Sequence, residues 1–305
     1  MPRTLVVLLA LATLVCALPA AAQSATTRDA AVSDSTSAPL MLWSLSDADN
    51  TVYLLGSIHF ARPDLFPLAA PIEAAYDSAD VVVFEIDLAD MQAQAMALAQ
   101  RGMFPDTTTL ADVLPDSLYD RAVSVTAPFG LPEAAVSKME PWMLSLTLSS
   151  LELMTSGYAN GIDQHYYERA VADEKTVRAL ETVAFQIDLF DTMPMTTQTS
   201  FLRYTLDEAG SMATMLDGMT TAWAEGDTAA LDAFMNDGFV DFPEVKQRLL
   251  GDRNAAWVPQ IEALLDGADD AFVVVGAGHL VGDESVVALL EAKGHRVPQR
   301  WSSPR

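Results

Sequence analysis

The sequence predicts an α/β domain whose central, mainly parallel sheet is built from the N- and C-terminal segments, with a large helical insertion between them. Strand-like apolar runs gather near the two ends of the chain, and the long middle carries apolar residues at helical spacing. A strand, a helix and a strand follow one another near the N-terminus, which indicates a βαβ unit. No Pro-, Gly- or Ser-rich linker divides the chain, so we expect a single domain over residues 41–301.

The N-terminal segment is expected to supply the first strands. Apolar runs at residues 42–46 and 52–55 flank the polar residues 47–50, a pattern typical of a hairpin. Residues 67–76 have helical character. Residues 81–86 form a continuous apolar run, as expected for a strand that is buried on both faces.

The middle of the chain is predicted to be mostly helical, and strands return towards its end. We expect short strands at residues 176–180, 271–275 and 296–301, with a helix at residues 283–293 between the last two. The helices predicted for the middle cover residues 89–101, 110–125, 133–154, 162–173, 181–190, 196–216, 231–236 and 245–265.

The first 22 residues are predicted to be a cleaved signal peptide. Arg3 gives a positive start, residues 4–18 form an apolar run, and Ala20-Ala21-Ala22 matches the small residues that signal peptidase accepts. The run is short for a bilayer, and nothing after it approaches the length of a membrane helix. We therefore expect an exported protein, periplasmic or secreted, without an integral membrane segment after cleavage. Residues 23–40 are predicted to be a disordered spacer.

Composition excludes several classes of function. Cys16 is the only cysteine and leaves with the leader, so the mature protein is expected to have no disulfide and no thiol chemistry. Lipidation of Cys16 is not favoured, because the residue before it is not small. The formal net charge is −25, which repels nucleic acid and anionic lipid as partners. We interpret the charge as favouring solubility, with attraction of cations or cationic substrates as the alternative.

Two segments with the same pattern follow predicted strands. Residues 52–59 and 272–279 align without a gap, and each contains a hydrophobic strand followed by Gly-x-x-His, which indicates a degenerate duplication. Sites in parallel sheets form beyond the carboxyl ends of the strands, so His59 and His279 are expected to face one point if these strands are neighbours. Glu85 ends a third strand at the same edge. Two imidazoles and a carboxylate can form the first shell of a divalent metal.

Each of these residues also has a structural alternative. A histidine after a strand can be a loop or capping residue, although two histidines in matched contexts favour a function. Glu85 can pair with an arginine, because a carboxylate at the end of so apolar a strand needs a partner. His165 and His295 lack such a context, and we expect them to be structural or exposed. The sequence contains no Gly-x-Ser-x-Gly elbow, no His-Glu-x-x-His and no phosphate loop.

Further motifs follow in order along nearly the whole mature chain. They are Leu55-Gly56-Ser57-Ile58-His59, the Glu85 strand, Gly161-Ile162-Asp163-Gln164, Leu180-Glu181-Thr182, Trp223 with Gly226-Asp227, Arg253-Asn254 and Gly276-Ala277-Gly278-His279-Leu280. This ordered set resembles the TraB/PrgY/GumN family, which is related to the Tiki proteins of animals. The resemblance implies a metal-dependent protease. The wider superfamily resembles erythromycin esterases and a haem-binding lipoprotein fold, so its chemistry varies on one scaffold.

Carried onto this chain, the resemblance implies His59, His279 and Glu85 as ligands of a divalent metal, which would be manganese, cobalt or zinc. Glu85 would be the third ligand or the base that activates the metal's water, and Glu181 would take whichever carboxylate role Glu85 leaves. Arg253 would stabilise an oxyanion or bind a substrate carboxylate. The alternative for Glu181 and Arg253 is a buried salt bridge that supports the site.

We therefore predict an exported metal-dependent hydrolase, with a peptidase as the preferred class, that acts on a peptide or small-molecule substrate. A second hypothesis is a non-catalytic peptide-, haem- or metal-binding protein of the same fold. A third is metal-free acyl hydrolysis with a histidine as base. The oligomeric state stays open. In the second hypothesis an adaptable apolar surface would be formed by methionines that we otherwise expect in the core, namely Met193, Met195, Met212, Met215 and Met219.

Overall fold

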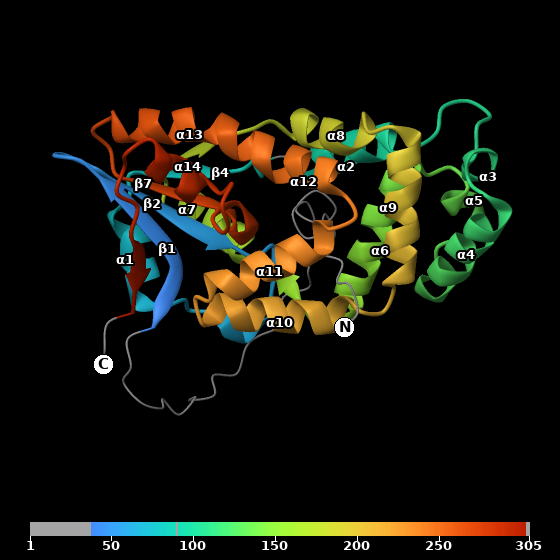
Figure 1. Ribbon diagram of the computed structural model, residues 1–305, viewed down its shortest axis with the longest axis horizontal. Coiled ribbons are helices and arrows are strands. Elements are labelled where there is room, and N and C mark those ends of the chain that lie inside the picture. The colour runs from blue at the N-terminus through green and yellow to red at the C-terminus, as the bar shows by residue number, and fades with distance from the viewer. Residues whose placement is uncertain (1–37, 90, 303–305) are drawn as a thin grey trace.

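The structure, a computed structural model, describes residues 38–89 and 91–302, and a six-stranded sheet forms one end of the molecule (Figure 1). Its strands are β1 (Pro39–Ser46), β2 (Thr51–Ser57), β4 (Val81–Phe84), β6 (Thr176–Ala179), β7 (Ala271–Gly276) and β8 (Gln299–Trp301). They lie in the order β6-β4-β7-β2-β1-β8. The first four of these run parallel, and β1 pairs antiparallel with β2 and β8. The predicted fold class is confirmed.

The hairpin predicted near the N-terminus is present. The register of β1 and β2 pairs Leu42 with Leu55. In the turn, the carboxylate of Asp47 accepts the backbone N–H groups of Asp49 and Asn50, both at 3.1 Å. An aspartate that bonds the backbone two residues ahead is a usual turn former, so the local sequence accounts for this element.

The carboxyl ends of β2, β4 and β7 lie at one edge of the sheet, because the crossover from β2 through α1 (Ala70–Ser78) returns β4 parallel to β2. Strand β7 comes last of the three in the sequence, but it lies between β2 and β4 and runs parallel to both. Val274 is thus opposite Leu55 on one side and Phe84 on the other. All four residues of β4 are buried, as its continuous apolar run predicted.

Helices make up most of the rest of the chain. Three predicted helices are each divided in two: Pro115 directly precedes one new helix and Pro141 begins another, because proline has no N–H to continue a preceding turn. Gly210, with φ of +89°, separates the third pair. The helices are α2 (Met91–Arg101), α3 (Leu110–Val113), α4 (Asp116–Thr126), α5 (Glu133–Val136), α6 (Pro141–Thr155), α7 (Ile162–Ala172), α8 (Val183–Asp191), α9 (Met195–Asp207), α10 (Met212–Ala224), α11 (Thr228–Phe239), α12 (Pro243–Lys246), α13 (Asp252–Leu265) and α14 (Val286–Ala292).

The helical part extends the molecule away from the sheet. Figure 1 shows α3, α4 and α5 at the end opposite the sheet, with α6 and α9 side by side between the two ends. Helices α10 and α11 pack against each other near the sheet's edge, where α10 also contacts β1. One continuous hydrophobic core joins the strands to these helices.

The five methionines considered above as a possible surface lie in or against this core, as expected. Met193, Met212, Met215 and Met219 are buried, and Met195 is partly buried against the same core. The hypothesis of a broad exposed methionine surface therefore has no support from these five residues. Met219 has a second role, because it also lines a cavity beside the strand ends.

The predicted signal peptide and spacer lie mostly outside the described residues. Strand β1 begins at Pro39, so the last two residues of the predicted spacer belong to the sheet. The predicted signal peptide, residues 1–22, and the spacer up to residue 37 lie outside the described residues. Over residues 38–89 and 91–302, no helix has the length and apolar character needed to cross a membrane.

Candidate functional site

Three predicted site residues meet at the carboxyl edge of the sheet. Ser57, which ends β2, lies opposite Gly276, which ends β7, and so the two Gly-x-x-His segments are neighbours. His59, Glu85 and His279 follow adjacent strands and are 8%, 6% and 1% exposed. A methyl group on Gly276 would lie 3.5 Å from His59 Nε2, 3.4 Å from Glu85 Oε1 and 3.7 Å from His279 Cδ2. The structure therefore brings the three side chains around one point, and the glycine keeps that point open.

His59 is held from behind by Asp163. The Nδ1 atom of His59 lies 2.9 Å from Asp163 Oδ2, and the hydroxyl of Ser57 donates to Asp163 Oδ1 at 2.6 Å. Burial disfavours a charged imidazole, but the charge and hydrogen bond of Asp163 outweigh it and raise the pKa of His59 to about 9. The other ring nitrogen, Nε2, is buried and has no partner among the described residues.

A close contact between two backbones places Asp163 beside His59. The short strands β3 (Phe60–Ala61) and β5 (Ala159–Asn160) pair antiparallel just after His59 and just before Gly161. A Cβ on Gly161 would lie 2.0 Å from the carbonyl oxygen of Ile58, so only glycine fits there. The Gly161-Ile162-Asp163 motif marked this position in the sequence, but its role as the partner of His59 was not predicted.

His279 is held as a neutral ring by Asn254 and Arg253. The amide nitrogen of Asn254 donates to the carbonyl oxygen of Glu284 at 2.8 Å, which turns its Oδ1 towards His279 Nδ1 at 2.6 Å. We assign the proton to Nδ1 on this basis, so Nε2 accepts from Arg253 Nη1 at 3.1 Å. Burial and the adjacent charge of Arg253 lower the pKa of His279 to about 3.

Arg253 links the carboxylates of Glu85 and Glu181, which follow the neighbouring strands β4 and β6. Its side chain is fully buried, and its Nη2 donates to Glu85 Oε2 and to Glu181 Oε2, the latter at 2.9 Å. Trp257 Nε1 donates to Glu181 Oε1 at 2.9 Å. Burial alone would raise the pKa of Glu85, but the charge of Arg253 outweighs it and lowers the pKa to about 2. The buried salt bridge that was the alternative role for Glu181 and Arg253 is therefore present.

The chain segment before Arg253 has an unusual backbone. Residues Gln247–Gly251 form a π-helical turn between α12 and α13, inside the stretch predicted as one helix. The Leu249 carbonyl of this turn accepts from Arg253 Nη1 at 3.0 Å. Such turns often occur at functional sites, and here the turn precedes the residue that joins the carboxylates to His279.

The remaining two histidines lie apart from this cluster, as expected. His165 stacks on Phe66 with ring centroids 4.3 Å apart. His295 Nε2 lies 2.9 Å from a carboxylate oxygen of Glu262. Both contacts agree with structural roles.

The arrangement of motifs extends over most of the chain, and residues 41–299 match the model of the TraB/PrgY/gumN family. The chain belongs to the TraB/PrgY/gumN family. It is similar to the uncharacterized protein YbaP of Escherichia coli (strain K12), with 23% identity over 240 residues, which cover 78% of this chain and 87% of that protein. It is also similar to an uncharacterized protein of Treponema pallidum (strain Nichols), with 22% identity over 272 residues, or 83% and 80% of the two chains. No solved structure matches significantly.

Two of the three metal ligands predicted for this TraB/PrgY/gumN protein, His59 and Glu85, share a small cavity. A cavity of about 10 Å³, close to the space that one water needs, is lined by both residues and by Asp163. A histidine that gives one nitrogen to a carboxylate and leaves the other free is usual at metal sites. The predicted third ligand, His279, instead uses the lone pair of its Nε2 to accept a hydrogen bond from Arg253. Within the described ranges, no three His, Cys, Asp or Glu side chains are grouped as a ready metal site.

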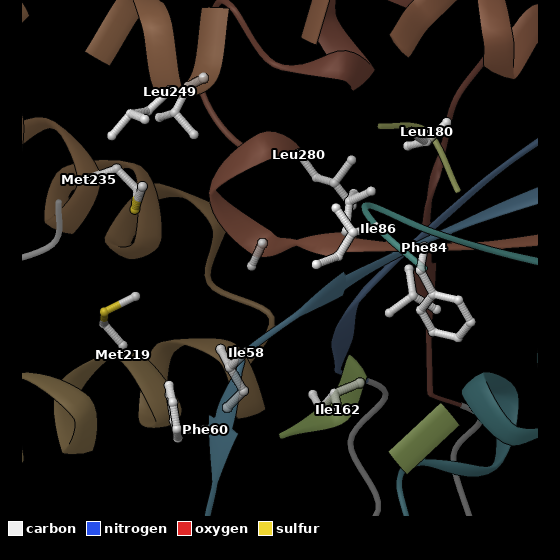
Figure 2. Packing of buried hydrophobic residues seen from close by; sticks show 14 of the residues in the cluster. Ile58, Phe60, Phe84, Ile86, Ile162, Leu180, Met219, Met235, Leu249 and Leu280 are labelled. Atoms are coloured by element: carbon white, nitrogen blue, oxygen red, sulfur yellow. The ribbon is translucent and has the colours of Figure 1, made fainter. Parts of the chain in front are cut away.

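A second cavity, of about 40 Å³, adjoins the same histidines on the side of α10 and α11. Figure 2 shows Met219 and Met235 pointing towards one another there, with Ile58 and Phe60 nearby. Sequence patterns did not predict this cavity, because its walls come from segments that are distant in the sequence. Its lining consists of Ser57, Ile58, His59, Phe60, Leu216, Met219, Thr220, Leu231, Met235, Leu250, Gly276, Ala277, Gly278 and His279.

Proposed function

We propose that this protein is an exported, metal-dependent hydrolase, with a peptidase as the preferred class. One observation carries the proposal: Nε2 of His59 is buried and has no partner among the described residues. It faces the same open point beside Gly276 as Glu85 Oε1 does. A buried polar atom without a partner costs free energy. That cost is offset if a ligand binds at this point.

His59 and Glu85 would hold the metal in this proposal. When bound, a divalent metal lowers the pKa of a coordinated water towards neutrality, which makes hydroxide available for hydrolysis. Asp163 keeps the Nδ1 side of His59 occupied, so that Nε2 is the nitrogen aimed at the open point. Because His59 must be unprotonated to bind a metal, loading the site releases its proton.

Arg253 and Glu181 act as positioning residues in this proposal. Arg253 draws Oε2 of Glu85 towards itself, and the backbone N–H of Gly276 donates to Oε1 at 2.8 Å. Glu181 in turn fixes the guanidinium through Nε and Nη2. His279 accepts from the same guanidinium, which sets the orientation of Arg253. Glu85 is thus presented to the open point in a single orientation.

Metal-free hydrolysis is the second candidate. It is favoured by the position of Arg253, which takes the lone pair that a third metal ligand, His279, would use. A histidine whose Nδ1 bonds an aspartate is also the arrangement of a general base in hydrolases. In this version His59 Nε2 would accept the proton of an attacking water once the ring is neutral.

Metal content and turnover can be measured on the same preparation of the mature protein. We expect manganese, cobalt or zinc to bind to the wild type and not to His59→Ala or Glu85→Gln, whereas His295→Ala, outside the site, retains the metal. Cleavage of a peptide library should stop with a chelator and return when metal is added. Cleavage that ignores the chelator but is lost in His59→Ala supports the metal-free route. Ligand binding without cleavage of any peptide or ester contradicts the hydrolase.

A further inference from the structure

We infer that the larger cavity is a substrate subsite for a short aliphatic side chain beside the bond that is cleaved. The inference rests on the proposed hydrolase function and adds the class of substrate. The cavity is bounded by both Gly-x-x-His segments on one side and by α10 and α11 on the other. It therefore opens directly onto the residues that are proposed to react.

The walls select an uncharged, apolar group. Among the lining residues, His59 and His279 are the only ionisable ones, and the facing side chains are aliphatic or thioether groups such as Leu216, Leu231 and Met235. A cationic group placed there would lose its hydration without gaining an ion pair, because no carboxylate lines this cavity. An aliphatic group would gain apolar contacts with these walls.

The size of the cavity limits the group to a few carbon atoms. A cavity needs about 10–15 Å³ to hold one water. A volume of about 40 Å³ therefore has room for roughly three groups of the size of a water. The side chains of valine and leucine fall in this range, and an aromatic ring exceeds it. Met219 and Met235 face each other across the space and allow small adjustments, because thioether chains are flexible.

The positions of two glycines relate the subsite to the chemistry. His59 lines both this cavity and the smaller cavity shared with Glu85, so a group in the subsite lies next to the open point. A Cβ on Gly278 would lie 2.6 Å from the Met235 methyl carbon. Gly278 therefore allows Met235 to approach the second Gly-x-x-His segment and close one wall, while Gly276 keeps the open point free.

The test uses N-acetyl amino-acid amides of glycine, valine, leucine and phenylalanine, whose binding is followed by NMR titration without any need for turnover. We expect valine and leucine amides to bind the wild type about tenfold more tightly than glycine amide, and phenylalanine amide to gain nothing. Thr220→Phe, which fills the cavity from its half-buried wall on α10, should abolish this preference. Thr221→Phe, on the exposed neighbouring residue, is the matched control and should retain it. Met219→Ala should extend the preference to phenylalanine.

Equal binding of all four amides, or an aliphatic preference that survives in Thr220→Phe, overturns the subsite. Peptides with the same four side chains are then tested for cleavage. Cleavage without a side-chain preference leaves the hydrolase standing and contradicts the subsite. An aliphatic binding preference without any cleavage supports a ligand site and contradicts the hydrolase, so the two failures are distinguishable.

Discussion

The two ring nitrogens of His59 have opposite surroundings. Nδ1 faces a carboxylate that is itself held by Ser57, and Nε2 faces open space beside Glu85. A ring fixed in this way loses little freedom when it binds a ligand, because its orientation is already set. The function proposed for the site therefore depends on Asp163 as much as on His59.

Replacing Asp163 with asparagine tests this dependence. Asp163→Asn removes the charge behind His59 while keeping the size of the side chain, and we expect metal affinity to fall by about 10- to 100-fold. Titration of a competing chelator measures the affinity. Asp217→Asn, which removes the carboxylate of the exposed pair with Arg62, is the control and should bind metal like the wild type.

Substitution of Gly276 by alanine is expected to affect the site much more than the fold. In Gly276→Ala the new methyl group would be in ordinary contact with Glu85 and His59, at 3.4 and 3.5 Å, so the fold can accept it. The same methyl group fills the point around which the ligand atoms gather. We expect activity to fall by about 100-fold, with the free energy of unfolding changed by roughly 1 kcal/mol or less. Parallel assays and urea unfolding check this, and full activity would contradict the proposed location of the site.

At the scale of elements, buried carboxylates support helix ends as well as the site. Glu152 of α6 accepts the backbone N–H of Gly210, between α9 and α10, at 2.9 Å. Its second oxygen is buried without a partner among the described residues, and burial raises the pKa of this carboxyl group. The helix junction thus contains a group that is held more favourably in its protonated form.

This raised pKa predicts a dependence of stability on pH. The folded state binds the proton of Glu152 more tightly than the unfolded state, so its contribution is present at low pH and is lost as pH rises through the folded-state pKa. Glu152→Gln keeps the acceptor for Gly210 and cannot ionise. We expect it to stabilise the protein by about 1 kcal/mol at pH 8 and to give no gain near pH 4. Urea unfolding at both pH values measures the difference, and an equal effect at the two would contradict it.

At the scale of the whole molecule, Arg253 joins parts of the chain that are far apart in sequence. It contacts Glu85 after β4, Glu181 after β6 and His279 after β7, and its ring neighbour is Trp257, 4.7 Å away. A buried ion pair contributes little net stability by itself, yet removing one member leaves charges without a partner. The carboxyl edge of the sheet therefore depends on a single guanidinium.

Replacing this guanidinium should destabilise the whole domain. Arg253→Met leaves two buried carboxylates unpaired, and we expect the free energy of unfolding to fall by about 3–5 kcal/mol. The triple variant Arg253→Met, Glu85→Gln, Glu181→Gln removes the unpaired charges and should recover most of that loss. Urea unfolding of the two variants gives the comparison. A triple variant as unstable as the single one would show that packing, and not charge, is what Arg253 supplies.

Local patterns in the sequence predicted the class of fold and the edge of the sheet at which the site lies. Strand runs, Gly-x-x-His turns and the glutamate that follows β4 are local patterns, and parallel strands necessarily place their carboxyl ends on one edge. His59, Glu85 and His279 could therefore be predicted to lie together. Helix breaks at Pro115 and Pro141 were readable in principle, because proline limits helices locally, but helical periodicity alone passed over them.

The pairing of the polar groups and their surroundings follow from the packing of segments that are distant in the sequence. Asp163 lies 104 residues from His59 in the sequence, and Arg253 lies 168 residues from Glu85. The aliphatic cavity requires α10 and α11 to pack beside the strand ends. Hydrogen bonds and cavities depend on distances between folded segments, and no local pattern encodes those distances. The sequence identified His59, Glu85 and His279 as residues that meet, and the packing determined that Arg253 contacts His279 while His59 Nε2 has no partner among the described residues.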